Sequence, residues 1–378
     1  MRLFARPSTS WHTPSEARHC PRMARRGGRW LAAMFATAAL TGCSLIGSSS
    51  GSSGGDGAEG AESGGTVVLL THESWALPKK LVRSFEEESG YTLEVEAAGD
   101  AGTLTNKLVL TAGAPAGDVA FGVDNTFATR ALDAHVFQDA EVSPAPGAEA
   151  YALPEGSDQL LPIDSASVCV NIDTDWFSAH DVTPPRTLDD LTKPAYRDLL
   201  VTPGAATSST GMVFLLATIA KYGDDWPDYW SSLLDNGAKL TDGWSDAYYV
   251  DFTQGGQHGQ RPIVVSYDSS PAFTVADGRS TTRALLDTCF QQVEYAGVLD
   301  GAANPAGARA FLEFLQSPAV QAALPTSMYV FPVRTDTPLP ADWKRFAKQP
   351  TSPWSIDPAE ISAHRSDWLT TWTEVTTR

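Results

Sequence analysis

From residue 66 onward, short apolar runs alternate with segments whose apolar residues recur every three or four positions. Runs of this length, rich in Val, Leu and Thr, are typical of buried strands, whereas the longer spacing is typical of amphipathic helices. The first predicted strands are residues 66–70, 91–95 and 118–121, and the helices between them are residues 78–89 and 103–112. This order predicts a mostly parallel sheet that is covered by helices.

A second series with the same rhythm follows, and the simplest interpretation is two α/β lobes. Its predicted strands are residues 168–171, 199–201 and 263–267, and its helical segments are residues 188–191, 211–221, 304–324 and 358–376. In such sheets, ligands bind beyond the carboxyl ends of the strands. The loops that follow these strands contain aromatic rings, carboxylates and Ser or Thr hydroxyls. This mixture favours a flat, cationic, heteroaromatic ligand, because aromatic faces attract cations and carboxylates accept from amines.

The N-terminal 65 residues have a different pattern. Three arginines precede an apolar run at 31–40, which is too short to span a bilayer and is followed by Leu-Thr-Gly-Cys43. This segment resembles a bacterial lipobox, so residues 1–42 are interpreted as a signal peptide, with Met23 as an alternative start, and Cys43 as the lipidated residue. Residues 43–65 are Ser- and Gly-rich and are interpreted as a tether.

The charge of the chain narrows the class of protein further. With 27 basic and 45 acidic residues, its net charge is −18, which argues against a nucleic-acid binder. Cys169 and Cys289 would lie in an oxidising compartment, where they either form a disulfide or remain as two buried thiols. No Cys-x-x-Cys motif, His-Glu-x-x-His motif or Gly-x-Ser-x-Gly motif is present, so no zinc site, catalytic residue or enzymatic activity is predicted.

An ordered set of motifs carries a family resemblance over residues 67–378. The motifs are GVDN at 122–125, SSTG at 208–211, YGDD at 222–225, GWSDAY at 243–248, VSYDSSPA at 265–272, FLQSPA at 314–319 and LPT at 324–326. Together with the Trp-rich C-terminal helix, they resemble the thiamine-binding periplasmic proteins of bacterial ABC transporters. The resemblance implies an α/β, two-lobed, type II periplasmic-binding fold, with the ligand in the cleft between the lobes.

The resemblance also implies lobe boundaries and a set of ligand contacts. Lobe 1 would comprise residues 66–165 and 288–378, lobe 2 would comprise residues 166–287, and the hinge strands would lie near 163–170 and 292–295. The implied ligand-binding residues are His72, Asp100, Ala101, Ser208, Ser209, Trp244, Tyr267, Asp268, Ser269, Ser270, Phe273 and Tyr329. Trp244, Tyr329 and Phe273 would face the rings of thiamine. Asp100 would bind the aminopyrimidine, and the two serines of the SSTG motif would hold the hydroxyethyl or phosphate end.

Three positions depart from the family pattern. His72 stands where the family has Tyr, Asp268 where it has Thr, and Ala101 where it has Gly. A protonated His72 would repel a cation, and an additional carboxylate would oppose a phosphate group. Asp268 therefore suggests a preference for free thiamine over its phosphate esters.

The resemblance further implies the partners and the location of the protein. We expect a monomer that is lipid-anchored on the outer face of the cell membrane and delivers thiamine, or thiamine phosphate, to a permease. No Gly-x-x-x-x-Gly-Lys-[Ser/Thr] motif is present, so a separate ATPase subunit is required. No cofactor and no metal are expected. The alternatives are same-fold binders of a polyamine, a thiamine analogue or ferric iron; Tyr248 and Tyr249 would face opposite sides of a strand and could not easily share an iron ion.

Overall fold

The computed structural model describes residues 64–378, apart from residue 257. The predicted signal peptide, Cys43 and all of the predicted tether before residue 64 lie outside the described residues. The strands are β1 (Gly65–Thr71), β2 (Tyr91–Ala97), β3 (Val119–Asp124), β4 (Leu161–Asp173), β5 (Leu200–Pro203), β6 (Lys239–Thr241), β7 (Ile263–Tyr267), β8 (Val275–Ala276), β9 (Arg279–Ser280), β10 (Thr282–Val298) and β11 (Phe331–Pro332).

Helices flank these strands on both faces. The α-helices are α1 (Lys79–Ser89), α2 (Ala101–Leu110), α3 (Ala128–Asp133), α4 (Thr174–Ala179), α5 (Ser209–Tyr222), α6 (Trp226–Asp235), α7 (Ser270–Phe273), α8 (Pro305–Leu315), α9 (Pro318–Ser327), α10 (Ala341–Phe346) and α11 (Pro358–Thr376). Short 3₁₀-helices lie at Ala148–Tyr151, Leu188–Thr192, Pro194–Tyr196 and Gly223–Asp225, and a π-helix lies at Asp246–Asp251.

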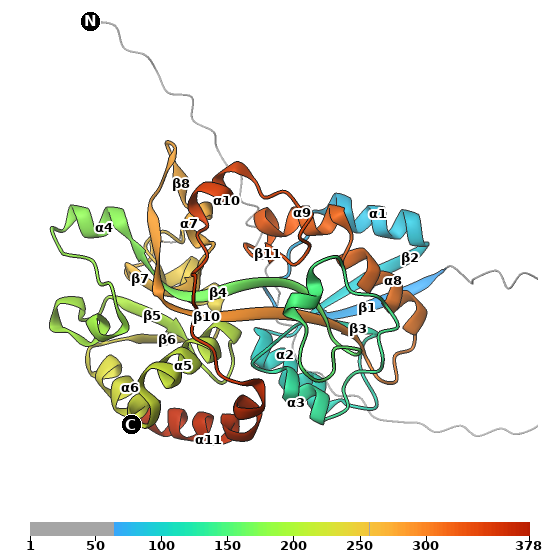
Figure 1. The fold of residues 1–378 in the computed structure, drawn as a ribbon, viewed down its shortest axis with the longest axis horizontal. Coiled ribbons are helices and arrows are strands. Elements are labelled where there is room, and N and C mark those ends of the chain that lie inside the picture. The colour runs from blue at the N-terminus through green and yellow to red at the C-terminus, as the bar shows by residue number, and fades with distance from the viewer. Residues whose placement is uncertain (1–63, 257) are drawn as a thin grey trace, which may run out of the picture. The chain divides into compact units, whose positions relative to one another are not determined.

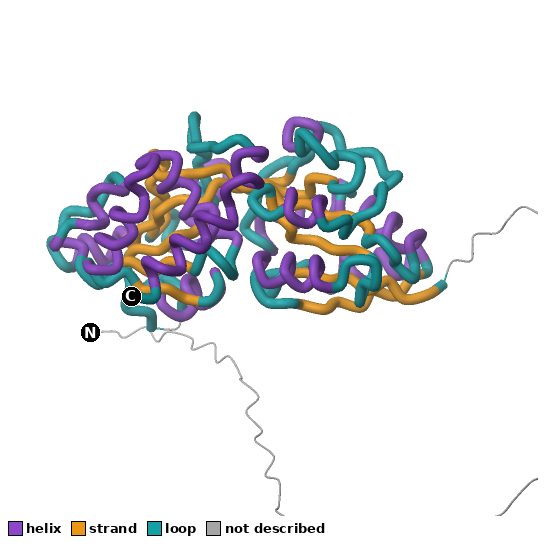
Figure 2. Tube along the Cα trace, turned by 90° about the horizontal axis from the view of Figure 1, so that it is seen from below, coloured by secondary structure: helices purple, strands orange, loops and turns teal. Residues whose placement is uncertain are grey.

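One mixed sheet joins two lobes in the order β2-β1-β3-β10-β4-β7-β5-β6. β1 pairs in parallel with β2 and β3, and β5 pairs in parallel with β6 and β7, so each lobe has a parallel group of three strands. The long antiparallel strands β4 and β10 run between these groups (Figure 1). In the view of Figure 2, the described residues form two groups of helices and strands that the central strands connect.

The side chains of β1 show why both faces of the sheet are covered. Val67 and Leu69 are buried in a core with Phe311 of α8, whereas Leu70 belongs to a core on the other face with Leu104 of α2. Successive side chains of a strand point to opposite faces, so a strand that is apolar at both sets of positions requires a helix layer on each side. The uninterrupted apolar runs of the sequence have this physical origin.

Most predicted elements are confirmed, with three differences of physical interest. The predicted strand at 168–171 is the end of a 13-residue strand, and most of the 17-residue β10 had no prediction at all. Both contain polar and charged residues that interrupt the apolar pattern. The single helical segment predicted at 304–324 is two helices, because the Ser317 hydroxyl caps a new helix that begins at Pro318.

A disulfide between Cys169 and Cys289 joins the two central strands. Cys169 lies on β4 and Cys289 on β10, and both are fully buried. This structure therefore decides between the two possibilities that the sequence left open, in favour of the disulfide. The bond links two strands that also pair with each other and that pass between the lobes.

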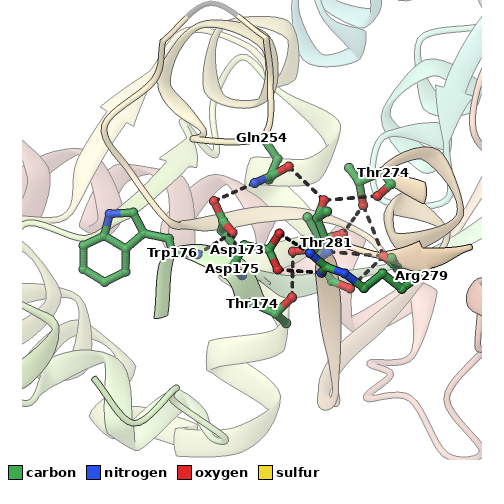
Figure 3. Close-up of polar contacts among 10 residues, drawn as sticks. Asp173, Thr174, Asp175, Trp176, Gln254, Thr274, Arg279 and Thr281 are labelled. Carbon is green, nitrogen blue, oxygen red and sulfur yellow. Dashed lines mark hydrogen bonds and ion pairs between the residues drawn. The ribbon is translucent and has the colours of Figure 1, made fainter. Parts of the chain in front are cut away.

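A polar network anchors the β8–β9 hairpin, which follows the predicted ligand loop 267–273 (Figure 3). Asp173 at the end of β4 accepts from the backbone of α4 through one carboxylate oxygen and from Gln254 at 2.9 Å through the other. The Thr281 hydroxyl donates to the Gln254 side chain, and Arg279 forms a two-point ion pair with Asp175 at 2.7 and 2.8 Å. These contacts fix the β9 end of the hairpin to α4 and to its N-cap residue.

Among residues 64–256 and 258–378, no helix combines the length and the apolar character that crossing a membrane requires.

Candidate functional site

Asp100 connects the two lobes. It is the N-cap of α2, where one carboxylate oxygen accepts from the Ala101 amide at 2.6 Å. The other oxygen accepts from the backbone amide of Trp244 at 2.9 Å, a residue that follows β6 in the second lobe. Ser74 and Ser245 also meet across the lobes, with their hydroxyl oxygens 3.4 Å apart. The structure is therefore that of a closed arrangement, in which the lobes touch.

Aromatic rings surround Trp244. Its indole stacks on Tyr248 with a centroid distance of 5.0 Å and lies 5.7 Å from the ring of Tyr267. Its Nε1 donates to the Ser266 hydroxyl at 2.9 Å, which lies 2.9 Å from the Ser270 hydroxyl. Trp244 is thus held in one orientation from both sides, so that it is fixed in place before any ligand arrives.

A second pair of rings lies at the edge of this cluster. Phe273 and Tyr329 have ring centroids 4.1 Å apart, and the side chain of Phe273 is 45% exposed. The Ser269 hydroxyl donates to the backbone carbonyl of Tyr329, whose φ of 60° is strained for a residue with a side chain. Strained residues of this kind often occur at ligand sites, and here the hydrogen bond from Ser269 stabilises the strained backbone.

Three buried carboxyl groups form a row across neighbouring strands. Glu294 of β10 is the direct cross-strand partner of Asp124 on β3 and of Asp164 on β4. Burial and then the Glu294 charge raise the pKa of Asp164 well above its usual range. Burial raises the pKa of Asp124 to about 6, against the hydrogen bonds from Ser209 and Thr126. Like charges in direct cross-strand positions are destabilising, so the row either keeps a proton on Asp164 or gains from a bound cation.

His72 is the basic side chain at one side of this row. Its Nε2 lies 3.4 Å from a carboxylate oxygen of Glu294, and its Nδ1 accepts from the Ser74 amide at 3.2 Å. Burial lowers the pKa of His72, but the surrounding carboxylates, Glu294 first, outweigh this and leave the pKa raised. Because Nδ1 accepts from the Ser74 amide, this geometry is that of the neutral ring with its proton on Nε2, whereas a protonated His72 would lose this hydrogen bond and oppose a cationic ligand.

Several buried polar atoms around the row have no hydrogen-bond partner. They are Thr71 Oγ1, both carboxylate oxygens of Asp164, Ser165 Oγ and Gln292 Oε1. Buried polar groups are nearly always paired in folded proteins, so we expect water or a ligand to supply the partners of these atoms. Burial is the largest cause of the raised pKa of Tyr267, and the charges of Glu294 and Asp100 raise this pKa further. The Tyr267 ring therefore lies beside these carboxylates.

The two serines of the SSTG motif have different positions. Ser209 donates to Asp124 across the lobes and accepts from Gln292 at 3.2 Å, so it belongs to the carboxylate row. Ser208 is the N-cap of α5, and its hydroxyl lies 3.0 Å from the hydroxyl of Thr210. Ala101 is buried in the first turn of α2, directly after Asp100.

Asp268 lies on a different side from the other candidates in its loop. It is 0% exposed and lines a cavity of about 500 Å³ with Arg279 and Arg345. Tyr267 packs near Trp244 instead, as expected for successive residues at the end of a strand. Neither carboxylate oxygen of Asp268 has a hydrogen-bond partner, and burial raises its pKa to about 7.

We expect Asp268→Asn to stabilise the protein as the pH rises. The folded state keeps the Asp268 proton up to about pH 7, whereas the unfolded chain loses it near 3.8, so ionisation reduces stability between these values. The free energy of unfolding of the variant should exceed that of the wild type by about 2–4 kcal/mol at pH 8, and by much less at pH 4. Urea unfolding at both pH values measures this, and a difference that does not grow with pH would contradict the explanation.

The structure thus brings ten of the twelve predicted residues into contact with one another or with the carboxylate row. The connected residues are His72, Asp100, Ala101, Ser209, Trp244, Tyr267, Ser269, Ser270, Phe273 and Tyr329, whereas Ser208 caps a helix and Asp268 lines the second cavity. The sequence did not indicate Asp164, Glu294 and Gln292 as candidate site residues. All three lie in the segments that were predicted to form the hinge. A charged residue within an otherwise buried strand was the available signal.

The prediction that Tyr248 and Tyr249 lie in a strand is wrong. They belong to the π-helix Asp246–Asp251, and their ring centroids are 5.6 Å apart. Alternation along a strand therefore does not prevent Tyr248 and Tyr249 from sharing an iron ion. Within residues 64–256 and 258–378, no cluster of three or more His, Cys, Asp or Glu residues has a geometry that could hold a metal ion.

Comparison with known proteins places this geometry in a family. Residues 80–351 match the model of the bacterial extracellular solute-binding protein family. The chain belongs to this family. A thiamine-binding periplasmic protein of Escherichia coli (strain K12) is 28% identical over 309 residues, covering 80% of this chain and 90% of the relative. A thiamine-binding periplasmic protein of Brucella suis is 29% identical over 337 residues, covering 83% and 92%.

Solved structures of solute-binding proteins agree with the fold. A periplasmic thiamin binding protein superposes with a TM-score of 0.73 and 27% identity, covering 84% of this chain and 98% of its own. The α/β, two-lobed fold that the sequence predicts for this solute-binding protein is confirmed. The exact lobe boundaries stay a prediction; α11, predicted within lobe 1, also packs its Trp372 against Trp230 of α6, with ring centroids 5.6 Å apart.

Proposed function

We propose that this solute-binding protein captures thiamine between its lobes and delivers it to a membrane permease that a separate ATPase drives. The observation that carries the proposal is the row of Asp124, Glu294 and Asp164, which lies beside an aromatic cluster and lacks a full complement of positive charge. Thiamine has a permanently cationic thiazolium ring and a flat aminopyrimidine. Two relatives match this chain over about nine-tenths of their own length. Both are named thiamine-binding periplasmic proteins.

The site residues suit the two parts of such a ligand differently. The carboxylate row attracts the thiazolium charge, and Trp244 and Tyr267 offer ring faces next to it. Phe273 and Tyr329 form the exposed edge, where a ring can enter. Asp100 already holds the lobes together, so its contact with an amine would strengthen the same closure. We expect no catalytic turnover, because nothing in the proposal requires the ligand to react.

A polyamine is the second candidate, and a specific observation favours it. In addition to the carboxylate row, Asp100 and Glu73 lie near His72, because the charges of both raise its pKa. Five carboxyl groups exceed what one thiazolium charge needs. Spermidine, with several positive charges, would use more of them, although it would leave the aromatic cluster without a planar partner.

Calorimetric titration with thiamine, thiamine monophosphate, thiamine diphosphate and spermidine tests the proposal. We expect submicromolar thiamine binding, weakened about tenfold by Phe273→Ala, because one exposed ring contributes about 1–2 kcal/mol. Leu110→Ala is the matched control, since Leu110 is 85% exposed and lies outside the cluster. Absence of thiamine binding by the folded protein would reject the proposal, and tighter spermidine binding would favour the second candidate.

Gly102→Ala should block closure without harming the fold. A Cβ at position 102 would lie 2.8 Å from the backbone oxygen of Thr207, at the place where α2 meets the loop before α5. The Thr103 amide donates to the same oxygen at 3.3 Å, so neither segment can move apart while the lobes stay closed. Thiamine affinity should fall at least tenfold, whereas stability should hold or rise, because alanine favours helices. Lower stability with unchanged affinity would contradict this.

The location and the assembly of the protein complete the proposal. An acylated Cys43 would anchor the chain to the outer face of the cell membrane. Residues 43–65 would act as a tether that lets the two lobes reach the permease. The protein would act as a monomer. Mass spectrometry of the mature N-terminus tests the anchor directly. A mature protein that begins elsewhere, without a lipid, would contradict this part and leave ligand binding untouched.

A further inference from the structure

A second concave site lies between α3 and α11, outside the cluster described above. Its cavity measures about 830 Å³, and Arg130 of α3 and Arg365 of α11 line it from opposite helices. No candidate ligand-binding residue lines this cavity. In the view of Figure 1, α11 runs along the lower edge of the described residues, to the left of α3.

Arg365 is buried without a counter-charge. It is 7% exposed, its guanidinium lies 4.1 Å from the ring centroid of Phe127, and its Nε has no hydrogen-bond partner. No described carboxylate forms an ion pair with it, although Asp124 is near enough to act on its pKa. A buried charge that is neither paired nor fully hydrogen-bonded is costly, so it is seldom kept in a fold without a binding partner.

Arg130 makes the position of Arg365 less favourable still. Burial, followed by the Arg130 charge, lowers the pKa of Arg365 to about 10. Arg130 itself donates only to the neutral side chain of Asn106 among the described residues. Two guanidinium groups that face one cavity without a shared carboxylate repel each other, and an anion between them would reverse the sign of this interaction.

The rest of the lining suits a small anion at the arginine end. Ser362 and Ser366 line the same wall of α11, one turn apart, and offer hydroxyl donors. Asp133 and Glu374 also line the cavity, and both are exposed to solvent. These carboxylates disfavour a large anion that fills the whole cavity, but they leave room for a compact one beside Arg365.

We propose that Arg130 and Arg365 bind a phosphate-type oxyanion in the cavity between α3 and α11. The planar fork of arginine matches two oxygens of a phosphate, and two forks around one anion neutralise both buried charges. The phosphate group could belong to a free small molecule or to the headgroup of a phospholipid. The proposal does not depend on thiamine binding, because the two sites share no lining residue.

Titration of the purified protein with inorganic phosphate at low ionic strength tests this inference. We expect saturable binding and a rise in melting temperature, neither of which sodium chloride of equal ionic strength reproduces. Arg365→Met and Arg130→Met should each weaken phosphate binding at least tenfold. Arg309→Met is the matched control, because Arg309 also has an unpartnered Nε but pairs with Glu141 at 2.9 Å.

The variants also distinguish a binding site from a structural arginine. Without phosphate, Arg365→Met should melt at the same temperature as the wild type or higher, because it removes an unpaired buried charge. Arg130 is less buried than Arg365, so Arg130→Met is the more conservative change for the fold. It serves as the second test variant if Arg365→Met does not fold. Failure of the wild type to bind phosphate saturably, or equal loss of binding in Arg309→Met, would overturn the proposal.

Cosedimentation with phosphatidylglycerol vesicles separates the two sources of phosphate. Binding to vesicles that Arg365→Met abolishes identifies a lipid headgroup as the occupant. Phosphate binding without vesicle binding identifies a free phosphate compound. Either result supports the site, provided that the Arg309→Met control behaves like the wild type.

Discussion

Glu294→Gln should weaken thiamine binding by at least 30-fold while making the unliganded protein more stable. Glu294 lies at the centre of the carboxylate row, with Asp124 and Asp164 as cross-strand partners. Removing its charge takes away the group that best attracts a buried cation, which is worth about 2–4 kcal/mol of binding. The same change relieves the repulsion within the row and should raise the free energy of unfolding by about 1–2 kcal/mol. Calorimetry and urea unfolding measure the two effects.

Weaker binding together with higher stability is expected where repulsion between buried charges destabilises the unliganded protein and the ligand relieves this repulsion. Glu96→Gln is the matched control, because Glu96 is a partly exposed strand residue that pairs with Lys107 at 3.4 Å. It should change neither quantity noticeably. If Glu294→Gln lowered stability instead, the ion pair with His72 would outweigh the repulsion, and the row would be a structural feature rather than a cation site.

Loss of the disulfide should reduce stability by about 4 kcal/mol. Cys169 and Cys289 are separated by 120 residues, and closing so long a loop removes much of the freedom of the unfolded chain. Replacing both cysteines by alanine should lower the urea midpoint and increase the slope, because the unfolded chain without the cross-link exposes more surface. Reduction of the wild type should lower it by a similar amount, which separates the cross-link from the small cavity that alanine leaves.

The position of the disulfide gives this prediction a second consequence. Both cysteines lie on the strands that pass between the lobes, so the bond fixes the spacing of β4 and β10 near the carboxylate row. We expect thiamine affinity to fall by about threefold in the reduced protein, because the row loses part of its preorganised geometry. Equal urea midpoints for oxidised and reduced protein would show that the bond contributes nothing to the fold.

The sequence predicts the elements with a regular apolar pattern well. Helix α11 spans the residues that its pattern indicated, and α1 ends at Gly90, whose φ of 76° only glycine adopts freely. β7 also matches its predicted bounds. In these segments, the local periodicity and the burial in the tertiary structure follow the same rule, so the sequence alone is sufficient.

The sequence is less informative for β10. Its 17 residues include Arg283, Asp287 and Glu294, which break the apolar pattern by which a buried strand is recognised. The pairing with β3 and β4 makes this segment a strand, and that pairing involves residues more than a hundred positions away. The carboxylate row has the same origin, since no local pattern indicates that Asp124, Asp164 and Glu294 become neighbours.

The sequence by itself determined the class of this protein and most of its candidate ligand residues. Alternating apolar runs set the layered α/β lobes, and the motifs around Asp124, Trp244 and Tyr267 resemble those of one family. Only the tertiary structure decided that Cys169 pairs with Cys289, that Asp268 lines a separate cavity, and that Nε of Arg365 has no hydrogen-bond partner. The physical reason is that pairing and charge compensation depend on distances through space, whereas periodicity is a property of neighbours along the chain.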